Sequence, residues 1–168
     1  RKYVLTYGLL LGALLSASMI YMVYKCYSAE GFAGNEILGY IFIFVGHLAV
    51  FFGAFQYRNK ELGGFISFGE AFKVAALIAF VASTIYVITW LFCYYFFVPD
   101  FMEKYAPIAI QKAQQEGKDV AAVAKEMAQF KEWYKNPIFI VLLTYMEVLP
   151  IGLVVALVSA LILKKKKL

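Results

Sequence analysis

Long apolar stretches separated by short polar segments dominate this chain of 168 residues. Several of these stretches are long enough to cross the hydrocarbon core of a membrane, which takes roughly 20 helical residues. The pattern predicts four spanning helices, at residues 3–24, 37–55, 68–98 and 138–163. The 63% hydrophobic content lies well above that of soluble proteins and agrees with an integral membrane protein.

Small residues recur at intervals of four or seven within each predicted span, and this spacing places them on one helix face. Gly8 and Gly12 begin such a stripe in the first span, and Gly152 and Ala156 begin one in the last. Small side chains let membrane helices approach each other closely. We therefore expect an all-α fold, an integral membrane four-helix bundle that forms a single domain over residues 1–168.

The segment 99–136 is the longest part of the chain outside the predicted spans. Asp100 followed by Glu103 predicts a capped helix start. Gly117 then interrupts the helical pattern, and Asp119 can cap a second helix. The sequence therefore predicts an extramembrane helical hairpin between the third and fourth spans.

The second helix of this hairpin carries one apolar seam, because its apolar residues recur by alternating threes and fours. The seam consists of Val120, Val123, Met127, Phe130 and Tyr134. Two interpretations are open. The seam either covers apolar surface within the protein itself or forms a docking face for a partner.

Basic residues collect on one side of the predicted spans, and short cytoplasmic segments are typically enriched in Lys and Arg. That side would hold nine basic residues and two acidic ones, which predicts that both termini are cytoplasmic. The net charge of +5 then reflects membrane topology and does not indicate nucleic-acid binding. The residues expected to anchor this side to anionic lipid headgroups are Arg58, Lys60, Lys164, Lys165, Lys166 and Lys167.

Polar residues lie at mid-membrane depth. A rise of about 1.5 Å per residue places Glu147 roughly 13 Å and His47 roughly 15 Å into their spans. A carboxylate at that depth costs about 2.5 to 3.5 kcal/mol, so it should face the interior, find a partner or be neutral. His47 is the natural candidate partner, and Ser83, Thr84 and Thr144 complete a candidate intramembrane polar site.

Helical geometry separates Glu147 from the small-residue stripe of the same span. At 100° per residue, Gly152 and Ala156 point roughly 140° to 180° away from the acid, so both cannot face one neighbour. Pro150 is expected to kink this helix. Three roles stay open for Glu147: a hydrogen bond that sets helix register, movement of protons or ions, and contact with lipid or a partner.

The chain lacks the usual signatures of catalysis. One histidine and two distant cysteines cannot supply a metal site of ordinary ligand count. No Gly-rich phosphate loop, nucleophile elbow or paired-carboxylate motif is present. We therefore expect no enzyme activity, no metal and no cofactor. Cys26 and Cys93 both lie toward the predicted outer side, where they either stay free thiols or form a disulfide.

Several short motifs occur in a characteristic order: YRNK, GFISFGEAFKVA, PDFMEKYA, KNPIF and EVLPIGLVVALVSALILKKK. Over nearly the whole chain, this order resembles the Bacteroidota membrane proteins grouped as domain of unknown function 4199. The resemblance implies a four-span inner-membrane protein with residues 99–136 in the periplasm, and it implies no known activity. The family pattern also marks Arg58 and Glu147 for testing.

Two functions fit these features. The first is an accessory, assembly or interaction subunit of the inner membrane, with the periplasmic hairpin as its contact surface. The alternative is a small proton-linked or ion-linked transporter or channel, which requires a water-accessible pocket at Glu147. The expected partners are membrane lipids and either another protein or further copies of the chain.

Overall fold

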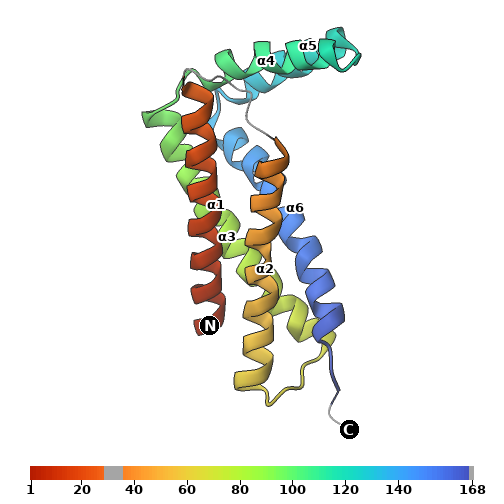
Figure 1. Cartoon of the computed structure of the whole chain (residues 1–168). Coiled ribbons are helices and arrows are strands. Elements are labelled where there is room, and N and C mark those ends of the chain that lie inside the picture. The colour runs from red at the N-terminus through yellow and green to blue at the C-terminus, as the bar shows by residue number, and fades with distance from the viewer. Residues whose placement is uncertain (29–35, 167–168) are drawn as a thin grey trace. The chain divides into compact units, whose positions relative to one another are not determined.

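A computed structural model describes residues 1–28 and 36–166, without the side chains of Cys26, residues 36–40 and Phe42. The described chain is helical throughout its regular segments, which confirms the predicted all-α class (Figure 1). The helices are α1 (Lys2–Tyr27), α2 (Glu36–Glu61), α3 (Phe68–Phe96), α4 (Phe101–Gln115), α5 (Val120–Trp133) and α6 (Pro137–Leu163).

Three helices in the described chain are long and apolar enough to cross a membrane, which makes this a membrane protein. They are Lys2–Lys25 within α1, Phe68–Phe96 and Pro137–Leu163. The predicted second span, 37–55, lies in α2, which is not among the three. The first side chains of that span fall outside the described residues, and α2 ends in a polar turn that contains Arg58 and Lys60.

The chain falls into two compact units, and the single domain predicted over residues 1–168 stays a prediction. The first unit comprises Arg1–Thr89 and Tyr145–Leu168, and the second comprises Trp90–Thr144. The first unit therefore contains α1, α2, most of α3 and the longer part of α6.

Small residues bring the helices of the first unit together, as their spacing predicts. Ala75 and Ala79 on α3 and Ala156 on α6 are almost fully buried. Glycines in α1, α2 and α6 lie so close to α3 that an added Cβ would lie 2.5–2.8 Å from a side chain of that helix, as three pairs illustrate. These pairs are Gly12 with Ile85, Gly53 with Ile78 and Gly152 with Ala79.

The connection between α2 and α3 is a glycine turn followed by a capped helix start. Gly63 and Gly64 adopt φ values of 61° and 92°, which L-residues rarely adopt. The Ser67 hydroxyl then accepts a hydrogen bond of 3.2 Å from the Glu70 amide and caps α3. Beside this turn, Ile66 pairs with Lys165 in an isolated antiparallel bridge. The end of α6 is therefore held next to the start of α3 (Figure 1).

Several helix ends differ from the predicted limits, including α1, which continues beyond residue 24 to Tyr27. The second helix continues beyond residue 55 to Glu61, because polar residues extend the helix past its apolar run until the glycine turn. The third ends at Phe96 and not at Val98. Pro99 follows Val98, and the residue before a proline is disfavoured in the helical conformation.

The second unit contains the predicted helical hairpin, in which α4 packs against α5. Gly117 has a φ of 67° at the turn, and the Asp119 side chain caps α5 by accepting from the Ala122 amide at 3.1 Å. The predicted cap at Asp100 is wrong, since its side chain makes no capping hydrogen bond. Its carboxylate instead forms an ion pair of 3.0 Å with Lys104.

Candidate functional site

His47 on α2 is buried, with 1% of its surface exposed. Its Nδ1 lies 2.7 Å from the carbonyl oxygen of Ile43, so Nδ1 carries the proton and donates to its own helix. Its Nε2 faces α6, where a Cβ added at Gly152 would lie 3.3 Å from this atom. The imidazole therefore fills the space that the missing side chain of Gly152 leaves.

The hydroxyl groups of the candidate polar site bond mainly to their own helices. Ser83 donates to the Ala79 carbonyl at 2.8 Å, Thr84 to the Phe80 carbonyl at 2.8 Å and Thr144 to the Ile140 carbonyl at 2.7 Å. Such bonds to the carbonyl four residues earlier satisfy a hydroxyl in an apolar surrounding. These three hydroxyl groups therefore need no polar partner from another helix.

Two hydrogen bonds between side chains link helices of the first unit. The Tyr145 hydroxyl lies 2.8 Å from Thr84 Oγ1, and because Thr84 donates to a carbonyl, the tyrosine is the donor of this pair. The Ser16 hydroxyl donates to Thr89 Oγ1 at 3.0 Å and links α1 to α3. Thr89 is not among the site residues predicted from the sequence, where it is one hydroxyl in a long apolar run. Its contact with Ser16 is set by the packing of α1 against α3.

Glu147 lies on the exposed side of α6. No hydrogen bond or ion pair joins it to any residue that the structure describes, His47 included. Gly152 and Ala156 face the interior of the first unit, which agrees with the angle that separates them from Glu147 in the sequence. The acid and the histidine therefore occupy different surroundings.

The residues that share the outward face of α6 with Glu147 are apolar. Val154, Leu157 and Leu161 are exposed to 61%, 44% and 50%. Pro150 is also exposed, and α6 continues through it. Its ring nitrogen has no hydrogen to donate to the preceding turn. The predicted kink at this position stays a prediction. The outward face of α6 thus carries one carboxyl group within an apolar surface.

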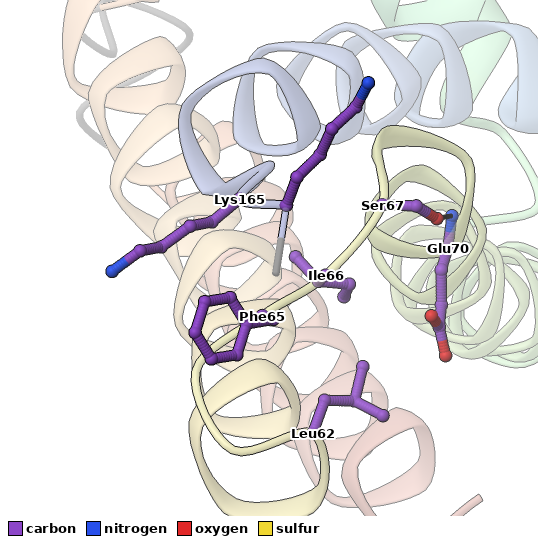
Figure 2. A pocket seen from close by; sticks show the side chains of 7 residues that line it. Leu62, Phe65, Ile66, Ser67, Glu70 and Lys165 are labelled. Carbon is purple, nitrogen blue, oxygen red and sulfur yellow. Dashed lines mark hydrogen bonds between the residues drawn. The ribbon is translucent and has the colours of Figure 1, made fainter. Parts of the chain in front are cut away.

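Two open cavities lie on the first unit, and neither includes Glu147 or His47. The first, of about 420 Å³, lies beside the bridge between Ile66 and Lys165 and is shown in Figure 2. The second, of about 410 Å³, is an apolar groove along α3 and α6. Its lining residues are Phe72, Lys73, Ala76, Leu77, Phe80, Leu149 and Leu153.

Arg58 has a defined position at the basic end of the first unit. Its Nη1 donates to the carbonyl oxygen of Leu163 at 3.3 Å, and its guanidinium lies 4.9 Å from the ring centre of Phe55. The last carbonyls of a helix lack partners within that helix and attract cations. Arg58 therefore caps the end of α6 from α2.

The predicted lysine anchors lie at the same end. Lys165 exchanges two backbone hydrogen bonds with Ile66, of 3.0 and 2.9 Å, and its Nζ lies 5.5 Å from the ring centre of Phe65. Lys60, Lys164 and Lys166 are exposed, whereas Lys167 lies outside the described residues. Their contact with lipid headgroups stays a prediction.

The seam of the hairpin is mostly covered. Met127 is buried, Val123, Phe130 and Tyr134 are half-buried, and Val120 is exposed. Within the second unit, the rings of Tyr134 and Tyr94 make an edge contact with centres 5.3 Å apart. Most of the seam therefore packs within the protein, and its predicted role in docking stays a proposal.

An ion-pair cluster closes the turn of the hairpin. Lys118 Nζ lies 2.6 Å from a carboxylate oxygen of Glu116, and Lys112 lies 3.8 Å from the other one. The hydrogen bond from Lys118 lowers the pKa of the Glu116 carboxyl below its ordinary value. This carboxyl is therefore ionised at neutral pH and holds the end of α4 to the residue after Gly117.

The described side chains include no group of three or more His, Cys, Asp or Glu residues that could hold a metal ion. Cys93 is buried and forms no disulfide with any described residue. The predicted choice between free thiols and a bond to Cys26 falls outside the described part, because the Cys26 side chain is not described.

Comparison with protein families identifies the family of this chain. A family model described as a protein of unknown function, DUF4199, matches residues 6–165, nearly the whole chain. No curated protein matches, and no solved structure matches.

Proposed function

We propose that this chain, which belongs to the DUF4199 family of proteins of unknown function, is an accessory or assembly subunit that binds another transmembrane helix through α6. The observation that carries this proposal is the exposed position of Glu147 on an apolar helix face without a partner among the described residues. Binding at this face would bring a hydrogen-bonding group to the carboxyl.

The energetic reason lies in the membrane. A carboxylate exposed to hydrocarbon costs about 2.5 to 3.5 kcal/mol, and ionisable residues within spans usually face other helices or water. Glu147 has no helix of the described chain against it, because the opposite face of α6 makes the internal contacts through Gly152 and Ala156. A partner helix that supplies a donor would remove much of this cost.

The hairpin is the second proposed contact surface, on the periplasmic side. It is less suited to binding than the face of α6, since Met127 is buried and Val120 is the only exposed member of its five-residue seam. We therefore assign the hairpin mainly to covering its own apolar residues.

The proposed setting is the inner membrane of a Bacteroidota bacterium, with four spans and both termini in the cytoplasm. Two contacts support a shared side for the termini. Tyr3 at the start of α1 contacts Tyr57 at the end of α2, with ring centres 6.1 Å apart, and Ile66 pairs with Lys165 after α6. Arg58, which caps α6, lies at this end as well.

Reporter fusions test this topology. Four spans predict that fluorescent-protein fusions at both termini are bright, because the fluorophore matures in the cytoplasm. A cysteine at Gln115 in the hairpin should react with a thiol reagent that cannot cross the inner membrane. Termini on opposite sides would reject α2 as a span and leave the three apolar helices of the described chain.

Photo-cross-linking in intact membranes tests the binding function. A photoreactive residue at Val154, on the face of α6, should give protein adducts. Leu10 on α1 is the matched control, since it is equally exposed at 61% and has no acid beside it. The control should give lipid adducts. Lipid adducts alone at Val154 would contradict the proposal.

Transport is the alternative, and the mid-span position of Glu147 favours it. This role requires water at the carboxyl, so the transport pathway would have to form between copies or with a partner. Proteoliposome flux that disappears on Glu147→Gln would support transport, whereas unchanged flux would remove it.

A further inference from the structure

The outward face of α6 has the spacing of a seam between two parallel helices. Exposed residues recur there by alternating threes and fours, at Glu147, Pro150, Val154, Leu157 and Leu161. An average spacing of 3.5 residues keeps such a row against a neighbouring helix in a left-handed pair. Such a seam has two core positions in every seven residues. Glu147, Val154 and Leu161 occupy one of them, and Pro150 and Leu157 occupy the other.

The chemistry of the carboxyl group favours a second copy as the partner. A protonated carboxyl has one donor and free acceptor oxygens, so two carboxyl groups that keep at least one proton satisfy each other. In a contact with twofold symmetry, each residue at the axis meets the same residue of the other copy. Two copies inserted in the same direction have parallel α6 helices, so Glu147 meets Glu147 at equal depth.

We propose that two copies of this chain form a parallel dimer through the outward face of α6, with the two Glu147 carboxyl groups hydrogen-bonded across the twofold axis. This inference rests on the proposed function and names the partner of the same face. A single polar residue in an otherwise apolar seam sets the register and the number of helices. The apolar contacts on the C-terminal side of Glu147 come from Val154, Leu157 and Leu161.

Disulfide cross-linking of the full-length chain in native membranes tests the geometry. In a background with Cys26→Ser and Cys93→Ala, single cysteines are placed in the seam by Val154→Cys or Leu161→Cys. Leu153→Cys is the matched control, because Leu153 is 38% exposed on α6 but lies outside the seam. The seam variants should form a species of twice the monomer mass, and the control should stay monomeric. Equal cross-linking at all three positions would overturn the seam.

Substitution of the acid tests the hydrogen bond. Glu147→Gln keeps a donor and an acceptor, so energy transfer between labelled copies in vesicles should persist. Glu147→Leu removes both, and association should weaken about 5- to 30-fold, as expected for the loss of an interhelical hydrogen bond of about 1 to 2 kcal/mol. Unchanged association in Glu147→Leu would exclude the carboxyl pair.

The adduct at photoreactive Val154 separates this inference from the function it rests on. An adduct with a second copy supports both. An adduct with a different protein overturns the dimer and leaves the assembly function in place; a basic side chain on that protein would then be the partner of Glu147. Lipid adducts alone overturn both.

Discussion

The imidazole of His47 faces Gly152 on α6, and its Nε2 would lie 3.3 Å from a Cβ at that glycine. Glu147 lies on the other side of the same helix and is exposed. The two ionisable side chains that the sequence predicts at mid-membrane depth are thus separated by α6. One of them packs inside the protein, and the other is available to a partner.

Replacing Gly152 should destabilise the protein. Gly152→Ala puts a Cβ 2.8 Å from that of Ala79 and 3.3 Å from His47 Nε2, so α3 and α6 must move apart. We expect a loss of about 1 to 3 kcal/mol, typical of overpacking, measured as a lower unfolding temperature in detergent. Gly69→Ala is the control, since a Cβ there has no neighbour within 4 Å. Equal effects of both substitutions would argue against this contact.

Replacing Arg58 should loosen the end of α6. Arg58→Ala removes the donor to the Leu163 carbonyl and the cation over Phe55. A charge near a helix end contributes about 0.3 to 1 kcal/mol. Faster amide exchange at Lys164 and Lys165 is the expected readout, because their amides follow this cap. Lys60→Ala removes an exposed charge from the same turn and should leave exchange unchanged.

The two aspartates of the hairpin should respond differently to substitution. Asp119→Ala removes the hydrogen bond to the Ala122 amide and should destabilise α5 by about 0.5 to 2 kcal/mol. Asp100→Ala should have a smaller effect, because Asp100 makes no side-chain cap. Hydrogen exchange over 101–133 measures both. Asp119→Asn should preserve most of the protection; a loss as large as that of Asp119→Ala would contradict the capping role.

The turn of the hairpin should weaken at acid pH. Lys118 lowers the pKa of the Glu116 carboxyl in the folded state. As pH falls, the unfolded chain, with a Glu pKa of about 4.3, therefore takes up a proton at a higher pH than the folded chain does. The stabilising contribution of the Glu116 carboxylate is complete above the pKa that this group has in the unfolded chain. It disappears as pH falls through the pKa of the group in the folded chain. Amide exchange at Gly117 between about pH 6 and 3 measures this loss. Glu116→Gln should remove the dependence, and a persistent dependence would assign it to another group.

Hydrophobic runs and turn residues were sufficient to predict most of the fold. They predicted the long helices α1, α3 and α6, the glycine turn at Gly117, and the cap at Asp119. These features depend on local chemistry, since apolar length, positive φ and a neighbouring acceptor are all encoded within a few residues. The angle between Glu147 and Gly152 also follows from helix periodicity alone.

Only the tertiary structure decided which groups meet. The sequence placed His47 and Glu147 at one depth, but rotation of α2 and α6 about their axes sets the direction of each side chain, and that rotation depends on packing against α3. The same holds for Arg58 at the end of α6 and for Thr89 beside Ser16, whose partners are distant in sequence. Periodicity fixes where residues lie relative to their own helix; contacts among several helices determine that Glu147 faces outward.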